Sequence, residues 1–171
     1  MIRVLVTGGT FDKEYNELNG QLFFRNTHVP EMLRRGRCHV DVFVQRLMMI
    51  DSVEMTAHER AQIVEECRAA DERQIVITHG TDTMVETAKV LAEAFPENGP
   101  KTIVLTGAMV PYAFDSSDGL FNLGSAISFV QVLPAGVYVA MNGRWFRWDC
   151  VKKNRETGVF EAFCEAPHPQ P

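Results

Sequence analysis

Short apolar runs alternate along the chain with longer stretches of mixed polarity. The runs are rich in Val, Ile and Leu, as strands of a parallel sheet are when helices cover both of its faces. They occupy residues 2–6, 39–44, 74–78, 102–106 and 136–141. Helical patterns fill residues 29–35, 57–70, 83–95 and 119–133. The pattern predicts an α/β fold with a single-domain, mainly parallel, flavodoxin-like sheet and helices on both faces.

Turn and capping signals sharpen these predictions. Asn19-Gly20 lies between two strand-capable runs and predicts a β-hairpin after the first strand, placed to act as a lid. Gly36 is expected to end the first helix, and Thr56 with Glu59 forms a capping-box pattern at the start of the second. The Arg/aromatic run at 144–148 predicts a hairpin packed on the sheet. We expect one domain over residues 1–164 and a flexible tail over 165–171.

Composition narrows the class of protein. The chain has 171 residues, 46% of them hydrophobic and 23% charged, which suits one globular domain. A net charge of −5 with scattered Lys and Arg argues against a nucleic-acid partner, and no apolar stretch approaches a membrane span. Met1 leads directly into a strand, so we expect no signal peptide. We expect the four widely spaced cysteines to be free thiols in a reducing cytoplasm: Cys38, Cys67, Cys150 and Cys164.

Two Thr-Gly turns carry the candidate chemistry. Thr7-Gly8-Gly9-Thr10 follows the first strand, and Thr78-His79-Gly80-Thr81-Asp82-Thr83 follows the strand at 74–78. Ligand sites of open α/β sheets lie at the carboxyl ends of the strands. Both turns are therefore expected to bring hydroxyls and glycine N–H groups to one rim, where they could hold and attack a small carbonyl compound.

The two turns, the predicted hairpin and Lys101, just before the strand at 102–106, together offer the groups that catalysis needs. Thr10 and Thr81 offer hydroxyls, Tyr15 lies in the predicted hairpin, and Asp82 and Lys101 offer opposite charges. A hydroxyl attacks only when a base removes its proton, and glycine N–H groups can stabilise the resulting oxyanion. Taken singly, each residue also has an ordinary structural role in a turn or on the surface. His79 is expected to hydrogen-bond the turn rather than to act as a base.

The sequence lacks the motifs of several other kinds of catalytic and binding site. There is no Gly-x-Ser-x-Gly elbow, no dinucleotide or P-loop motif and no zinc-protease motif, and the histidines are too sparse for a metal site. We therefore expect neither a metal nor a cofactor. A phosphate held at the first glycine turn stays open as an alternative.

Several blocks in order resemble the signature motifs of bacterial L-asparaginases. They are Val6 to Thr10, Thr78 to Ala88, Leu105 to Met109, Ser117 to Gly119 with Phe121 to Leu123, and Gly136 to Asn142. The resemblance extends to about Phe163 and is greatest to the short-chain, single-domain asparaginases. It implies hydrolysis of L-asparagine to L-aspartate and ammonia through an acyl-threonine intermediate, in a cytoplasmic enzyme that forms a homodimer or a higher homo-oligomer.

The resemblance also implies roles for individual residues. Thr10 matches the acylated nucleophile, Tyr15 the hairpin tyrosine that helps to activate it, and Thr81 the second threonine. Asp82 matches the carboxylate that holds the substrate ammonium, Lys101 the lysine paired with Thr81, and Ser52 the serine that binds the α-carboxylate. The N–H groups of Gly9 and Gly80 are expected to bind substrate or oxyanion.

Two differences from the larger relatives affect substrate recognition. Val53 stands where they carry a glutamine that contacts the substrate, and we expect the protein to lack their second domain, which lends an acidic residue. Two alternatives to an asparaginase therefore stay open. One is a non-catalytic sensor of an amino acid or amide, and the other is an amidohydrolase that acts on glutamine or another amide.

Overall fold

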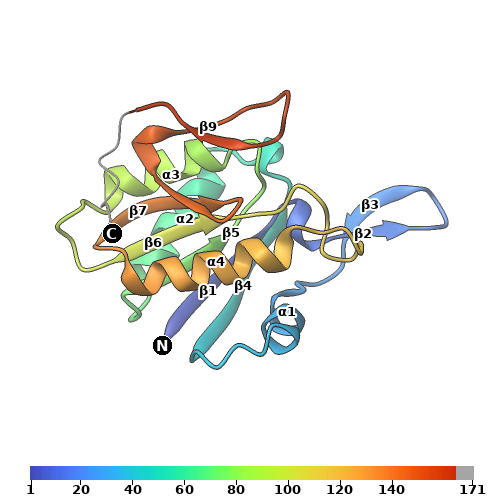
Figure 1. Ribbon diagram of the computed structural model, residues 1–171, viewed down its shortest axis with the longest axis horizontal. Helices are drawn as coiled ribbons and strands as arrows, with labels where there is room; N and C mark the ends of the chain where they lie inside the picture. Colours follow the sequence, from blue (N-terminus) through green and yellow to red (C-terminus); the bar gives the residue numbers. More distant parts are fainter. Residues whose placement is uncertain (165–171) are drawn as a thin grey trace.

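A six-stranded sheet forms the centre of the computed structural model, which describes residues 1–164 (Figure 1). The strand order is β4-β1-β5-β6-β7-β8, and every neighbouring pair is parallel except the last. The five parallel strands, numbered by their appearance along the chain, lie in the order 2-1-3-4-5. This is the flavodoxin-like order, and it confirms the predicted fold class.

The strands of this sheet are short apolar runs, as predicted. They are β1 (Ile2–Gly8), β4 (Val42–Ile50), β5 (Gln74–Thr78), β6 (Thr102–Thr106), β7 (Gly136–Met141) and β8 (Arg144–Arg147). Strand β4 begins and ends later than the expected 39–44. Its pairing with β1 starts at the Ile2–Val42 pair and continues as far as the Gly8–Ile50 pair. The Arg/aromatic run forms β8, a sixth strand antiparallel to β7, rather than a separate hairpin.

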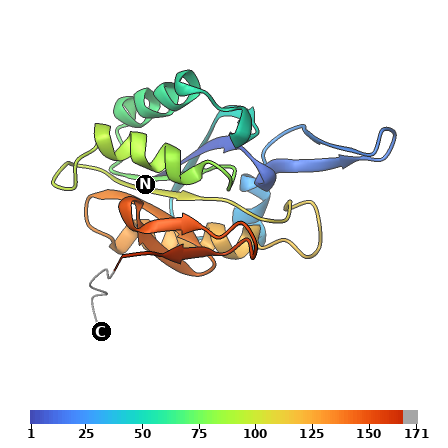
Figure 2. The same cartoon turned by 90° about the horizontal axis from the view of Figure 1, so that it is seen from above.

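Helices cover both faces of the sheet (Figure 2). They are α1 (Val29–Arg35), α2 (Ala57–Ala69), α3 (Met84–Ala94) and α4 (Gly119–Val132), with short 3₁₀ turns η1 (Thr10–Asp12), η2 (Ser52–Glu54) and η3 (Trp148–Cys150). The α2 and α3 side chains share one buried cluster with Leu5, and those of α1 and α4 share the other with Val4 and Val6. Successive strand residues thus enter opposite cores.

Two predicted helix ends are present as expected. Thr56 and Glu59 form the capping box of α2, and Gly36 is the C-cap of α1. None of the helices within residues 1–164 is both long enough and apolar enough to cross a membrane.

Two antiparallel hairpins stand outside the main sheet. The hairpin of β2 (Lys13–Asn16) and β3 (Gln21–Phe24) projects from the body (Figure 1) and exposes 92% of Leu18. The second pairs β9 (Val151–Lys153) with β10 (Phe160–Ala162). The first hairpin lies where the sequence predicts it, and its role as a lid stays a prediction. The proposed tail at 165–171 lies outside the described residues.

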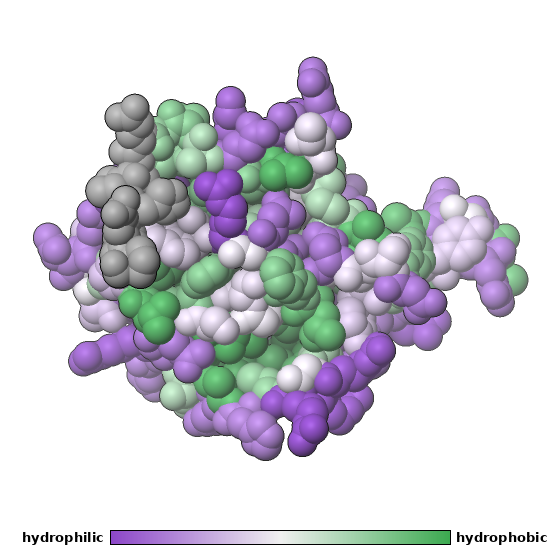
Figure 3. Space-filling model, viewed as in Figure 1, coloured by the Kyte–Doolittle hydropathy of each residue, from purple (hydrophilic) through white to green (hydrophobic). Residues whose placement is uncertain are grey.

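Apolar side chains also reach the surface on the face that α4 covers (Figure 3). Phe121 and Val132 of this helix are 63% and 77% exposed. Leu120, at 38%, extends the same apolar area towards α1.

The turns after β1 and β5 meet without side chains between them. A Cβ atom built on Gly9 would lie 2.3 Å from the Gly80 nitrogen and 2.5 Å from the Gly80 Cα. Gly9 also has a φ of +75°, which favours glycine. Only glycine at position 9 permits this approach of the two backbones.

We predict that Gly9→Ala lowers the free energy of unfolding by at least about 2 kcal/mol, through overpacking and an unfavourable φ. Urea denaturation followed by circular dichroism measures the change. Gly124→Ala is the matched control, because a Cβ there meets nothing within 4 Å and a helix-interior alanine should stabilise by about 0.5–1 kcal/mol. Equal stabilities for the two variants would contradict the packing argument.

Candidate active site

The candidate site is built from turns at the carboxyl ends of neighbouring strands. Strands β1 and β5 pair in parallel as far as Val6 and Thr78, so their turns leave the sheet side by side. Strand β1 is also where the chain order reverses, with β4 on its other side. Open α/β sheets bind their ligands in the crevice at such a switch point.

The structure brings three of the predicted residues into direct proximity. Gly9 packs against Gly80, and a Cβ on Gly80 would lie 2.5 Å from the Ser52 Oγ. Thr10 follows Gly9 at the start of η1 and is half-buried, and Thr81 follows Gly80 and is 5% exposed. Thr10 and Thr81 therefore each lie one residue beyond the point where the two backbones touch.

The glycine N–H groups are not equivalent. The Gly9 N–H donates to the Ile50 carbonyl at 2.9 Å, so it is occupied by the sheet edge and cannot serve substrate. Within residues 1–164, the N–H groups of Gly80 and Thr81 donate to no backbone carbonyl. The expectation for Gly9 as a donor is therefore wrong, and its role is to allow the close approach of the turns.

A lysine does reach Thr81, but it is Lys153. Its ammonium donates to the Thr81 Oγ1 at 2.8 Å and to the Asp82 Oδ1 at 2.7 Å. The Lys153 side chain is only 12% exposed, whereas that of Asp82 is 47% exposed. The Thr81 hydroxyl donates onward to the Met109 sulfur at 3.6 Å, a weak acceptor. This hydroxyl is thus polarised by a cation while its own proton is loosely held.

The predicted pairing of Lys101 with Thr81 is wrong. The Lys101 ammonium donates to the carbonyls of Ala70 and Glu72, at 2.6 and 3.0 Å. Lys101 directly precedes β6, so it stands at the amino end of a parallel strand, opposite the end that carries Thr81. The position of Lys101 before its strand was itself the sequence signal against a catalytic role.

Little in the sequence indicates a catalytic role for Lys153. It belongs to the basic pair Lys152-Lys153, which follows the Arg/aromatic run. Because β8 is antiparallel to β7, the chain turns at the carboxyl edge and η3 and β9 then pack back over α3. That path, visible in Figure 1, is a tertiary feature which spacing alone did not reveal.

The structure does not place the Tyr15 hydroxyl beside Thr10. Tyr15 is 56% exposed on β2, and its hydroxyl lies 3.9 Å from the Cβ position of Gly20, towards the hairpin tip. The base of the hairpin is anchored instead. The buried Asp12 carboxylate accepts from the Thr27 hydroxyl and the His28 N–H, at 3.0 and 2.8 Å, and burial raises the pKa of Asp12.

A second contact ties this base to the Ser52 turn. The Lys13 ammonium binds the Asp51 carboxylate, which also caps η2 by accepting from the Val53 N–H. Burial acts to raise the pKa of Asp51, but the Lys13 and backbone hydrogen bonds together lower it. An anchored base and an exposed tip are what a hinged segment requires.

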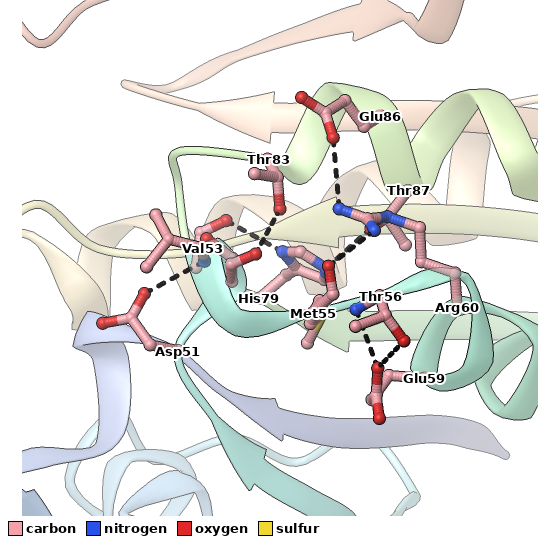
Figure 4. A network of polar contacts seen from close by, with 12 residues as sticks. Asp51, Val53, Met55, Thr56, Glu59, Arg60, His79, Thr83, Glu86 and Thr87 are labelled. Carbon is pink, nitrogen blue, oxygen red and sulfur yellow. Dashed lines mark hydrogen bonds and ion pairs between the residues drawn. The ribbon is translucent and has the colours of Figure 1, made fainter.

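His79 is the structural residue that the sequence predicts. It is fully buried, its Nδ1 lies 2.8 Å from the Gly80 carbonyl, and its Nε2 lies 2.9 Å from the Thr87 Oγ1 (Figure 4). Burial, opposed by the Gly80 hydrogen bond and aided by the charge of Arg60, lowers the pKa of His79 to about 4. The imidazole is therefore neutral near pH 7.

The cysteines differ from expectation. Cys150 and Cys164 form a disulfide that joins η3 to the end of the β9–β10 hairpin, so these two are not free thiols. Cys38 and Cys67 are free, and burial raises the pKa of the Cys67 thiol to about 12, which removes it as a nucleophile. Within the described part of the chain, no three His, Cys, Asp or Glu side chains gather as metal ligands would.

Comparison with known proteins assigns the family. Residues 1–170 match the family model described as "Asparaginase, N-terminal". L-asparaginase 1 of Escherichia coli K12 is 32% identical over 170 residues, a match that spans 95% of this chain and 49% of that protein. The chain belongs to the asparaginase family, and it spans about half the length of the curated relatives it matches.

Solved structures agree with the assignment. The thermostable L-asparaginase of Thermococcus kodakarensis superposes with a TM-score of 0.82 at 28% identity, over 94% of this chain and 50% of that one. The probable cytoplasmic L-asparaginase of Campylobacter jejuni gives a TM-score of 0.77 at 28% identity, over 94% and 52% of the two chains.

We predict that His79 makes the stability depend on pH. Its pKa is about 4 in the folded state and about 6.5 in the unfolded state, so the unfolded chain binds more protons between these values. The neutral histidine's contribution is then complete above pH 6.5 and is lost as the pH falls towards 4. Urea denaturation at several pH values should show a slope of up to about 1.4 kcal/mol per pH unit from this group. His79→Asn should flatten the profile, and an unchanged slope would contradict the assignment.

Proposed function

We propose that this chain carries an asparaginase active site and hydrolyses L-asparagine to L-aspartate and ammonia through an acyl-threonine intermediate. The observation that carries the proposal is the position of Lys153. It binds Thr81 and Asp82 on a turn whose backbone touches the turn that carries Thr10. A nucleophile, a polarised second hydroxyl, an ammonium and a carboxylate thus meet at one strand rim.

The proposed reaction gives each of these groups a defined role. The Thr10 hydroxyl attacks the side-chain amide carbon, and the N–H groups of the second turn stabilise the oxyanion. Ammonia leaves as the tetrahedral intermediate collapses to an acyl-Thr10 ester. The Thr81–Lys153 pair takes up the Thr10 proton during the attack and delivers a proton to the leaving nitrogen, so that the departing group is ammonia. The pair then takes a proton from the water molecule that attacks the ester and returns one to the Thr10 oxygen, which releases L-aspartate.

The surroundings suit an amino-acid substrate. Asp82 is half exposed and pairs with Lys153 through one oxygen, which leaves carboxylate capacity for a substrate ammonium. The Ser52 Oγ is buried and, within residues 1–164, has no hydrogen-bond partner. A substrate α-carboxylate would supply the acceptor that this hydroxyl lacks.

We propose that Tyr15 belongs to a lid that closes over the site. The anchored base of the β2–β3 hairpin and the exposed Tyr15 and Leu18 support a hinge that would bring the phenol towards Thr10. We assign residues 1–164 to one domain, and the exposed apolar face of α4 supports association of two or more copies. A cytoplasmic location is supported by the name of the Campylobacter jejuni neighbour and, within residues 1–164, by the free thiols of Cys38 and Cys67.

Thr10→Val should abolish ammonia release from L-asparagine, by at least roughly 10³-fold in kcat, because the isosteric side chain has no nucleophile. An ammonia assay measures the loss, and an unchanged melting temperature shows that the fold persists. Wild-type turnover in this variant would remove Thr10 as the nucleophile. Binding of asparagine by the wild type without turnover would favour the amino-acid sensor, and a higher kcat/KM for L-glutamine would change the substrate.

Replacing the two lysines in turn separates catalysis from structure. Lys153→Met should lower kcat roughly 10²-fold or more, because Thr81 loses its proton-transfer partner. Lys101→Met should keep the wild-type kcat but lower the free energy of unfolding by about 1–3 kcal/mol, because two carbonyls lose their donor. Steady-state kinetics and urea denaturation of both variants test this. A lowered kcat in Lys101→Met together with a wild-type kcat in Lys153→Met would instead place Lys101 in the catalytic site.

A further inference from the structure

A chain of buried polar groups runs behind the second turn. The Arg60 Nε of α2 donates to the Thr87 Oγ1 of α3 at 3.1 Å, and Thr87 contacts the Nε2 of His79 at 2.9 Å. His79 in turn contacts the Gly80 carbonyl through Nδ1, at 2.8 Å. Figure 4 shows Arg60, Thr87 and His79 next to one another.

The proton directions in this chain are determined by its two ends. A carbonyl only accepts, so the His79 Nδ1 must carry the proton at the Gly80 end. A guanidinium only donates, so the Thr87 Oγ1 accepts from Arg60 and has its own proton to give. The neutral His79 Nε2 receives it. All hydrogen bonds are satisfied in one arrangement, from Arg60 through Thr87 and His79 to Gly80.

This arrangement has a consequence for the adjoining peptide. The peptide bond is planar and trans, so the Thr81 N–H points opposite to the Gly80 carbonyl. Because buried His79 holds that carbonyl, the Thr81 N–H is turned away from it, and within residues 1–164 this N–H donates to no backbone carbonyl. The same peptide sets the direction in which the Thr81 side chain leaves the turn.

Arg60 also reaches the other side of the site. Its Nη1 donates to the Met55 carbonyl at 2.9 Å, directly after the η2 turn that carries Ser52. The guanidinium side chain is 11% exposed, and its Nη2 pairs at 3.2 Å with Glu86. One cation thus connects the Ser52 segment with the Gly80 segment.

We propose that Arg60, Thr87 and His79 form a positioning relay that orients the Gly80–Thr81 peptide for the reaction. The relay presents the Thr81 N–H to the oxyanion and aims the Thr81 hydroxyl at Lys153. It touches no reacting atom itself. A purely structural need at this place would be met as well by apolar side chains, since buried polar groups gain little over well-packed hydrophobic ones. The catalytic part rests on the proposed function.

The test compares two substitutions of Thr87. Thr87→Val keeps the shape but removes the hydroxyl, so His79 loses its donor and Arg60 its acceptor. Thr87→Ser keeps the hydroxyl. We expect Thr87→Val to lower kcat roughly ten-fold or more, with KM for asparagine changed less than about three-fold, and Thr87→Ser to restore most of the loss. Equal kcat values for the two variants, or a loss confined to KM, would overturn the relay.

A second pair covers the case in which Thr87→Val does not fold. The amide nitrogen of Asn can take the place of the His79 Nδ1 and donate to Gly80, whereas the longer Gln reaches the place of Nε2. We expect His79→Asn to keep a kcat at least several-fold above that of His79→Gln, after both are matched for folded protein by thermal melting. A His79→Gln kcat equal to or above that of His79→Asn would overturn the relay.

Nuclear magnetic resonance gives a readout that needs no turnover. In ¹⁵N-histidine-labelled wild type, His79 should be the neutral tautomer protonated at Nδ1 and unprotonated at Nε2 near pH 7. The Gly80 carbonyl ¹³C resonance should shift upfield in His79→Gln but less in His79→Asn, as its hydrogen bond is lost or kept. A tautomer protonated at Nε2, or equal Gly80 shifts, would overturn the relay. If these spectra agree while wild type releases no ammonia, the proposed function fails and the orientation of the peptide stands.

Discussion

The contact between Gly9 and Gly80 is the constraint on which the site depends. Two turns from adjacent parallel strands approach so closely that no Cβ fits between them. That approach places Thr10 and Thr81 one residue beyond a common point, and it puts Gly80 against Ser52. Because no side chain is involved, the geometry follows from backbone conformation and strand pairing, which are harder to disturb than rotamers.

The positive charge at this rim is the Lys153 ammonium, which comes from a distant part of the chain. Lys153 lies 72 residues beyond Thr81, on a short strand that the antiparallel β8 and the η3 turn return to the carboxyl edge. The Cys150–Cys164 disulfide joins the two ends of the segment that carries it. A lysine held at 12% exposure between a hydroxyl and a carboxylate is an uncommon arrangement on a surface, and it distinguishes a built site from a chance cluster.

The errors at Lys101 and Gly9 have physical causes. The resemblance implies Lys101 as the partner of Thr81, but Lys101 lies at the amino end of β6, and in a parallel sheet the two ends of the strands face opposite sides of the domain. Gly9 was assigned a free N–H, but the register between β1 and β4 extends far enough to engage it with Ile50. Tyr15 was predicted near Thr10, and the projecting hairpin keeps its phenol at the far end in this conformation.

The sequence by itself determined the order of strands and helices, the parallel fold class, the capping of α2 and the two Thr-Gly turns. These depend on local periodicity and on turn chemistry, which act within about ten residues of chain. Only the tertiary structure decided which lysine serves Thr81, which cysteines pair and how the relay from Arg60 reaches Gly80. Each of those contacts joins residues from separate elements, and their distance in space depends on packing that no local pattern encodes.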